Sequence, residues 1–197
     1  IVDEKVTAEQ AKFQLGFNNS TTYLLFFGQI KKAKRLDVLI KSMKHVKGDV
    51  KLVVAGRPWK DDFSKYDKLI SELELEDRVK KYIRFVTDEE RELFMKACDV
   101  MVLPYEEVYQ SAALLMAMSY GLAIITSDVD SFKEVIRQGK NGLMFKSLDE
   151  EDLSDKINSL LNDSEMLSQL QEGALKSIAS EFSWSNIGLQ YKKTLNL

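Results

Sequence analysis

The sequence predicts an α/β fold with a Rossmann-like, doubly wound parallel sheet of six strands and a helical C-terminal tail. Short apolar runs alternate with longer amphipathic stretches, which is typical of parallel strands joined by crossover helices. Several of these runs stop at glycine or proline, and no strand pattern follows residue 147. The 197 residues fit one domain, which we divide into a connector (1–20), a sheet core (21–146) and a helical tail (147–197).

Each expected strand is a short apolar run. The first two runs stop at Gly28 and Gly56, and the fourth stops at Pro104. The strands are expected over residues 23–27, 50–55, 82–86, 100–103, 123–126 and 141–145.

Each expected helix shows apolar residues at helical spacing or a terminating residue. Leu36, Leu39, Ile40 and Met43 recur at that spacing, and Thr87 is the expected N-cap of the helix after the third strand. The helices are expected over residues 1–17, 36–43, 65–75, 88–97, 110–120, 131–136, 152–161, 164–182 and 184–197.

Charge and composition exclude several classes of function. The net charge is -3 with scattered basic residues, so the charge pattern of a nucleic-acid-binding protein is missing. No run of about 20 apolar residues and no charged-then-apolar leader occurs, so we expect a cytoplasmic domain. Cys98 is the single cysteine and is expected to be a buried apolar residue. The opening at Ile1 suggests part of a longer protein.

Ligands of a doubly wound sheet bind beyond the carboxyl ends of its strands. The relevant loops are 28–35, 56–60, 86–88 and 104–113. The first begins with Gly28, which allows a ligand to approach the backbone, and carries four cations that suit a diphosphate. A solvated surface loop is an equally open interpretation.

The loop after the fourth strand leads into a helix expected to start near Gln110. Free amides of Ser111, Ala112 and Ala113, with the Ser111 hydroxyl, are suited to an anion. The small side chains at these positions leave room for a phosphate.

Residues 104–134 resemble the signature region of group 1 glycosyltransferases, the glycogen-synthase-like enzymes with the GT-B fold. In that family a helix ending Glu-Ala-Met-Ala-x-Gly-x-Pro-Val-Ile precedes Ser-Asp-x-Gly-Gly-x-x-Glu. The matching stretch here is Met116-Ala117-Met118-Ser119-Tyr120-Gly121-Leu122-Ala123-Ile124-Ile125-Thr126-Ser127-Asp128-Val129-Asp130-Ser131-Phe132-Lys133-Glu134. The likeness continues in order through Phe26-Phe27-Gly28, Leu52-Val53-Val54-Ala55-Gly56, Ala97-Cys98-Asp99-Val100 and Phe182-Ser183-Trp184.

The resemblance implies a C-terminal domain that binds a nucleotide sugar, with the acceptor held largely by an N-terminal domain absent from this chain. The catalytic residues cannot all be named from this half. The implied contacts are Gly28, Gln29, Lys34, Gln110, Ser111, Ala112 and Ala113 for the diphosphate; Gly56, Arg57, Phe85, Val86 and Met116 for the base and ribose; and Val108, Asp130, Ser131 and Glu134 near the donor sugar.

The chain departs from the family pattern at several of these positions. Val108 and Met116 stand where family members carry two glutamates, and neither side chain accepts a hydrogen bond. Gln29 replaces an arginine, while Asp130 and Ser131 replace two glycines. One branch of the family carries Gln-Ser-Gly, which Gln110-Ser111-Ala112 resembles. Altered donor contacts and reduced activity both remain open.

Three further features are interpreted as structural. Asp128-Val129-Asp130 has the spacing of the metal-binding aspartate pair found in the other glycosyltransferase fold. Because the fold expected here is a different one and the pair follows a strand, we expect it to be a surface turn. We therefore expect no metal. His45, near the end of a helix, is expected to be exposed. Trp184 and Tyr191 are expected to pack the tail helix.

The expected function is metal-independent transfer from a nucleoside diphosphate sugar, without a cofactor. The leaving diphosphate would be stabilised by Lys34 and the helix start at Ser111. The expected partners are a UDP- or GDP-sugar, an acceptor glycan or lipid-linked sugar, the chain's own N-terminal domain and, for the full-length protein, a membrane surface. The alternatives are a nucleotide-sugar epimerase, which needs carboxylates and a histidine around the sugar, and a non-catalytic scaffold.

Overall fold

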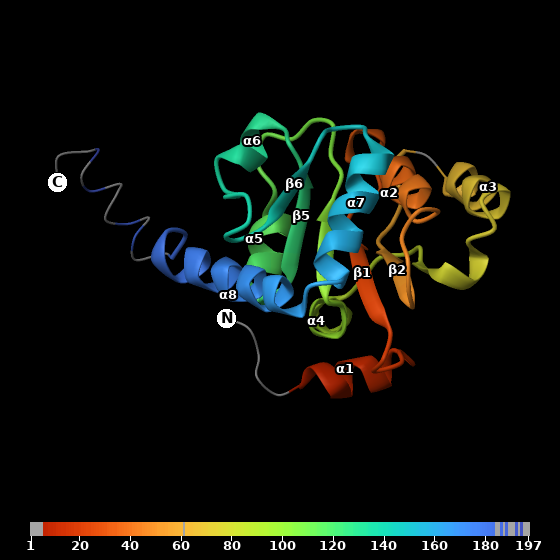
Figure 1. The fold of residues 1–197 in the computed structure, drawn as a ribbon, viewed down its shortest axis with the longest axis horizontal. Helices are drawn as coiled ribbons and strands as arrows, with labels where there is room; N and C mark the ends of the chain where they lie inside the picture. Colours follow the sequence, from red (N-terminus) through yellow and green to blue (C-terminus); the bar gives the residue numbers. More distant parts are fainter. Residues whose placement is uncertain are drawn as a thin grey trace.

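A six-stranded, all-parallel sheet forms the centre of the molecule in the computed structural model (Figure 1). The model describes residues 6–60 and 62–183, together with residues 186, 188, 192 and 194. The strand order is β3-β2-β1-β4-β5-β6, so the chain starts in the middle of the sheet and winds outward in both directions. The predicted doubly wound fold is confirmed. The strands are β1 (Thr22–Phe27), β2 (Val50–Ala55), β3 (Val79–Tyr82), β4 (Val100–Leu103), β5 (Ala123–Ser127) and β6 (Leu143–Phe145).

The third strand lies earlier in the chain than expected. The prediction of residues 82–86 was wrong, because β3 covers Val79–Tyr82 and ends where Tyr82 O accepts the Gly56 amide at 3.0 Å. β3 is an edge strand paired only with β2, so Lys80 and Lys81 can face water. A prediction based on continuous apolar runs misses such a strand, because two of its four residues are lysines.

The last strand is shorter than expected. β6 holds three residues because residues 139–141 form a turn before it and Gly142 makes only an isolated bridge with Gln138. Asn141 Oδ1 accepts the Arg137 amide at 2.7 Å, and Gly142 O accepts the Gly139 amide at 3.0 Å.

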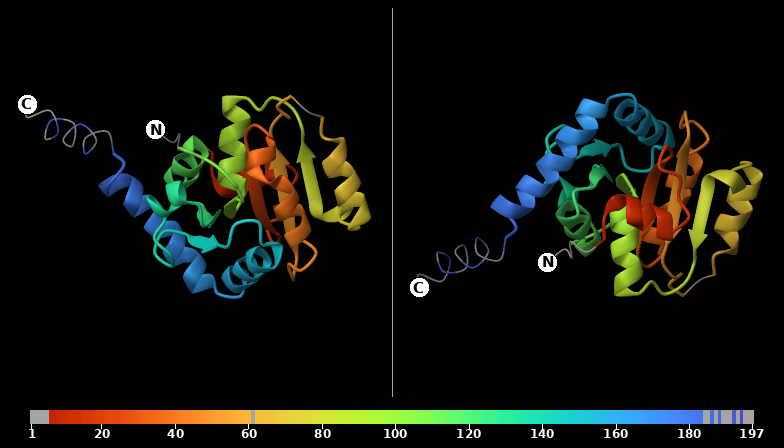
Figure 2. Two further views of the ribbon diagram at one scale, coloured as in Figure 1. Left: turned by 90° about the horizontal axis from the view of Figure 1, so that it is seen from above. Right: turned by 90° about the horizontal axis from the view of Figure 1, so that it is seen from below.

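Helices cover both faces of the sheet, as opposite winding directions require (Figure 2). α1 packs against α4, α2 packs against α3 and α7, and α8 packs against α5 and β5. The helices are α1 (Ala8–Gln14), α2 (Leu36–Ser42), α3 (Ser64–Glu72), α4 (Asp88–Ala97), α5 (Ala112–Ser119), α6 (Asp130–Lys133), α7 (Glu150–Leu161) and α8 (Ser164–Ser180), with short 3-10 turns at η1 (Lys32–Lys34) and η2 (Glu76–Arg78).

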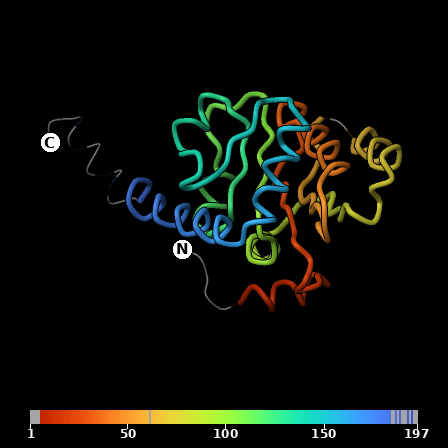
Figure 3. Tube along the Cα trace, in the orientation of Figure 1, coloured from red at the N-terminus to blue at the C-terminus, as the bar shows by residue number. Residues whose placement is uncertain are grey.

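Different helices lie at the two ends of the strands, which we call the amino edge and the carboxyl edge of the sheet. β1 begins on the side where α1 lies, and the trace in Figure 3 shows α1 and α8 on this amino-end side and α6 on the opposite side. The loops after β1, β2 and β4 therefore reach the carboxyl edge, where a ligand of such a sheet binds.

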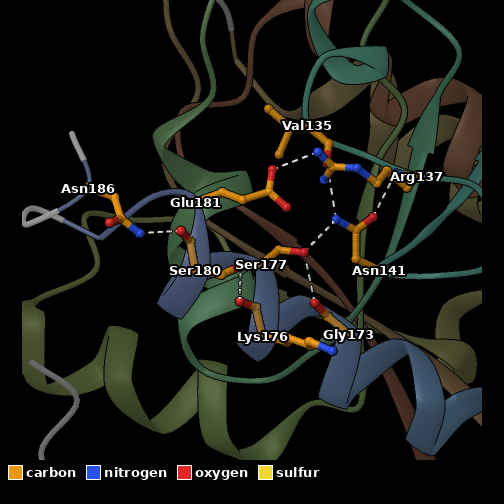
Figure 4. A network of polar contacts seen from close by, with 9 residues as sticks. All are labelled: Val135, Arg137, Asn141, Gly173, Lys176, Ser177, Ser180, Glu181 and Asn186. Atoms are coloured by element: carbon orange, nitrogen blue, oxygen red, sulfur yellow. Dashed lines mark hydrogen bonds and ion pairs between the residues drawn. The ribbon is translucent and has the colours of Figure 1, made fainter. Parts of the chain in front are cut away.

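A network of polar contacts holds α8 against the turn before β6 (Figure 4). Asn141 Nδ2 donates to Ser177 Oγ at 2.9 Å, and Arg137 pairs with Glu181 at 2.6 Å. Gly173 lets the backbone of α8 lie directly against the backbone of Lys140, because a Cβ at position 173 would lie 1.8 Å from Lys140 O. The helical tail is thus docked on the sheet by backbone proximity as well as by side chains.

Two structural interpretations made from the sequence are confirmed. Cys98 is 6% exposed, and burial raises the pKa of its thiol. His45 is exposed just before β2, where its carbonyl accepts Asn158 Nδ2 at 3.0 Å. Trp184 and Tyr191 lie outside the described residues. None of the helices among the described residues is long and apolar enough to cross a bilayer.

Candidate functional site

Two glycines bring the loops after β1 and β2 into contact at the carboxyl edge. Gly28 has φ of 102° and Gly56 has φ of 148°, conformations that side chains rarely adopt. A Cβ on Gly56 would lie 1.9 Å from Gly28 O, so no larger residue fits there. Gly28 is half-buried and Gly56 is buried, so the backbones of the two strand ends lie directly against each other with no side chain between them.

A cavity of about 200 Å³ lies next to these glycines. Phe85 forms one side and is 68% exposed, and the Arg57 guanidinium lies 6.0 Å from its ring centroid. An exposed aromatic ring beside two residues without side chains suits a flat heterocycle. The cavity brings together most of the residues expected for the base and two expected for the diphosphate; its lining residues are Phe27, Gly28, Gln29, Gly56, Arg57, Arg84, Phe85 and Val86.

Arg84 lines this cavity and was not predicted from the sequence. Its guanidinium pairs with Glu90, which lowers the pKa of Glu90 to about 2. Glu90 also accepts the Thr87 amide at 3.1 Å and completes the capping box of α4, which confirms Thr87 as the N-cap. The segment between β3 and α4 is therefore held as one unit with the cavity wall.

Lys34 ends the 3-10 turn η1, and its ammonium reaches back toward Gly28. A Cβ on Gly28 would lie 3.2 Å from Lys34 Nζ, and the ammonium lies 4.9 Å from the Tyr105 ring centroid. No described residue offers Lys34 a hydrogen bond or an ion pair. Burial, and to a smaller extent the nearby Lys31, lowers the pKa of Lys34 to about 8. The ammonium is thus a cation without a counterion at the strand end.

Arg35 joins the loop after β1 to the loop after β4. Its backbone has φ of 47°, and its guanidinium pairs with Asp37 at 2.8 Å and with Glu106 at 3.1 Å. The Asp37 hydrogen bond raises the pKa of Arg35. The Glu106 amide also donates to Ala33 O at 2.8 Å. These contacts fix the two loops side by side, which the sequence could not reveal.

α5 begins two residues later than predicted, because Ser111 is its N-cap and the helix starts at Ala112. Ser111 Oγ accepts the Leu114 amide at 3.2 Å, so the hydroxyl oxygen already caps the helix. Helix geometry leaves the amides of Ser111, Ala112 and Ala113 without an intrahelical acceptor. No other described residue accepts from them.

A second cavity, of about 570 Å³, lies between α5, α6 and the end of α8. It brings Gln110, Ser111 and Ala112 together with Ser131 and Glu134 from the expected sugar-side positions. Two aromatic residues that were not predicted, Tyr109 and Phe182, also line it. The full lining is Tyr109, Gln110, Ser111, Ala112, Leu114, Leu115, Ser131, Phe132, Glu134, Val135 and Phe182.

Five predicted site residues line neither cavity, namely Lys34, Val108, Ala113, Met116 and Asp130. Val108, Ala113 and Met116 are half-buried and pack against the core, and Val108 O accepts Ser131 Oγ at 2.6 Å. The Asp130 side chain is 99% exposed and pairs with Lys133 at 3.1 Å.

Of the two aspartates after β5, Asp128 and Asp130, the first has a structural role. Asp128 Oδ1 accepts the Ser147 amide at 2.9 Å and thereby joins the ends of β5 and β6. Asp130 opens α6, which covers Asp130–Lys133 rather than the predicted 131–136. In the part of the chain that the structure describes, no three His, Cys, Asp or Glu side chains gather as a metal site would require.

The sequence model of the family "Glycosyl transferases group 1" matches residues 7–177 of this chain. One similar protein is the N-acetyl-alpha-D-glucosaminyl L-malate synthase of Bacillus anthracis, with 27% identity over 97% of this chain and 50% of that protein. This chain spans about half the length of the curated relatives that it matches.

Solved structures share the fold. HepE of Anabaena, determined in complex with UDP-glucose, superposes with a TM-score of 0.85 at 20% identity, covering 96% of this chain and 52% of that one. The C-terminal domain of the group 1 family protein LpcC from Francisella tularensis superposes with a TM-score of 0.79 at 18% identity, covering 90% of this chain and 94% of that one. A domain of this size and topology has therefore been crystallised without the other half.

Proposed function

Because this chain belongs to the group 1 glycosyltransferases, we propose that it is the donor-binding domain of such an enzyme and holds a nucleoside diphosphate sugar at the carboxyl edge of its sheet. The observation that carries this proposal is the Lys34 ammonium, which lies beside Gly28 without a counterion among the described residues. The UDP-glucose complex of HepE, a protein with the same fold, supports the same class of ligand.

The cavity beside Gly28 and Gly56 is proposed to take the base and ribose. Its glycines leave the cavity wall without side chains, and Phe85 offers a ring face for stacking. The ligand is a UDP- or GDP-sugar, since each of these molecules combines a flat base with a diphosphate.

The diphosphate is proposed to lie between Lys34 and the start of α5. Lys34 supplies a positive charge, and the free amides of Ser111, Ala112 and Ala113 supply donors at the positive end of the helix dipole. These groups together would stabilise a leaving diphosphate without a metal ion and without a cofactor.

The sugar and the acceptor complete the proposal. The donor sugar is placed near Ser131 and Glu134 in the second cavity, and the absence of carboxylates at Val108 and Met116 alters its contacts relative to other family members. The acceptor, a glycan or a lipid-linked sugar, is held largely by an N-terminal domain, at a membrane surface facing the cytoplasm. Sugar transfer then needs that second domain.

An epimerase on the same scaffold lacks support at this edge. His45 precedes β2, so it lies at the amino end of the sheet, opposite the proposed site.

Calorimetric titration of this chain with UDP, GDP and UDP-glucose tests the proposal, with adenosine as the control. Binding of at least one of the three diphosphates, with adenosine bound far more weakly, is expected. Failure of every nucleoside diphosphate to bind would favour a non-catalytic scaffold and would contradict the proposed function.

A further inference from the structure

A buried tyrosine lies under the Lys34 ammonium at the centre of the carboxyl edge. Tyr105 follows Pro104 at the end of β4 and is 3% exposed. Its ring centroid lies 4.9 Å from Lys34 Nζ and 5.6 Å from the Phe132 ring centroid. The ring is therefore packed between the core and the one cation of the proposed diphosphate site that has no counterion among the described residues.

Hydrogen bonds on either side hold Tyr105 in place. Its carbonyl accepts the hydroxyl of Ser127, a fully buried residue at the end of β5. The next residue, Glu106, donates its amide to Ala33 O at 2.8 Å, beside Lys34. The ring is thus tied to the neighbouring strand and to the turn that carries the lysine.

The ring face attracts the ammonium through its quadrupole and leaves the positive charge intact. A carboxylate in the same place would form an ion pair and compete with a phosphate for the lysine. A neutral ring can orient Lys34 toward Gly28 while leaving its N–H donors free for an incoming anion.

We propose that Tyr105 is a positioning residue that holds the Lys34 ammonium beside Gly28, ready for the diphosphate of the donor. This inference rests on the proposed function, because it assumes that a nucleoside diphosphate binds there. The aromatic ring, and not the hydroxyl, would orient Lys34, since the Tyr105 hydroxyl is buried and has no hydrogen-bond partner among the described residues.

The hydroxyl provides a matched pair of variants. Tyr105→Phe keeps the ring face and removes only the unpartnered hydroxyl, whereas Tyr105→Leu keeps an apolar side chain and removes the ring. The two variants separate the contact with Lys34 from the filling of the core.

Calorimetry with UDP and with uridine provides the test, with thermal unfolding run in parallel to confirm that each variant is folded. Tyr105→Leu is expected to weaken UDP binding roughly three- to tenfold, the range of a partly desolvated cation–π contact, and to change uridine binding less than about twofold. Tyr105→Phe is expected to bind both ligands as the unaltered chain does. In a Lys34→Ala background, Tyr105→Leu is expected to cause no further loss for UDP relative to uridine.

Three results would overturn the inference while leaving the proposed function standing. They are equal losses for UDP and uridine in Tyr105→Leu, a Tyr105→Phe variant as weak as Tyr105→Leu, and a UDP-selective loss that persists without Lys34. Absence of UDP binding by the unaltered chain, together with absence of GDP binding, would instead overturn the proposed function and this inference with it.

Discussion

Replacing Lys34 with alanine should weaken the binding of a nucleoside diphosphate far more than the binding of the bare nucleoside. The ammonium lies beside Gly28 and has no counterion among the described residues, so a phosphate would be its first charged partner. A hydrogen bond to a charged group contributes about 1.5–3 kcal/mol. With a pKa of about 8, the side chain is mostly protonated at pH 7, so nearly all of that contribution is present.

This free energy corresponds to a loss of roughly 10- to 150-fold in affinity for UDP. Uridine has no phosphate, so its affinity should fall by less than about twofold. Isothermal titration calorimetry at pH 7 measures both. Lys146→Ala is the control, because Lys146 follows β6 at the far edge of the sheet and its side chain is 77% exposed. Equal losses for UDP and uridine in Lys34→Ala, or an equal loss of UDP affinity in Lys146→Ala, would refute the proposed diphosphate position.

Three further predictions concern the protonation of Lys34 and the close backbone approaches at Gly56 and Gly173. UDP affinity should fall as pH rises through about 8, because Lys34 deprotonates in the free chain near that value; binding at pH 8.5 should take up a proton, measured as a buffer-dependent enthalpy that uridine does not show. Gly56→Ala should lower the free energy of unfolding by about 3 kcal/mol or more, since its Cβ would lie 1.9 Å from Gly28 O, as urea denaturation would measure. Gly173→Ala should also destabilise the chain, by about 2 kcal/mol or more, although alanine favours helices, because its Cβ would lie 1.8 Å from Lys140 O.

Control variants separate these effects from general strain. Gly48 has φ of 85° but open space around the position of a Cβ, so Gly48→Ala should cost only about 1 kcal/mol from its backbone conformation. Glu172→Ala, at an exposed position next to Gly173 in α8, should change stability by less than about 0.5 kcal/mol. Glycine variants no less stable than these controls would contradict the close approaches described above, and the pH prediction fails if UDP and uridine show the same proton uptake.

Most of the fold was predictable because burial on both faces makes the central strands continuously apolar. β1, β2, β4 and β5 are of this kind, and their predicted positions match the observed ones within a residue or two. β3 was misplaced because an edge strand can carry Lys80 and Lys81 without burying their charges. The helix limits depend on caps such as Ser111, whose hydrogen bonds are visible only in three dimensions.

The candidate site was predictable only where a single segment carries the signal. Gly28, Gly56 and the small residues at the start of α5 stand out from their places after strands. The ion pair between Arg35 and Glu106 joins residues 71 positions apart, so no local sequence pattern predicts it. The Tyr105 ring under Lys34 depends on the same pairing of loops, and the sequence alone gives no means of finding it.

A nuclear magnetic resonance titration of the ¹⁵N-labelled chain with UDP tests the central claim most directly, because it reports on each backbone amide. If a nucleoside diphosphate binds at the carboxyl edge, the amides of Gly28, Gln29 and Gly56 should shift together with those from Ser111 to Ala113. Gly48 and Gly121, which precede β2 and β5 at the amino edge, should not move. Shifts gathered at the amino edge, or none at all with millimolar UDP and with GDP, would contradict the account.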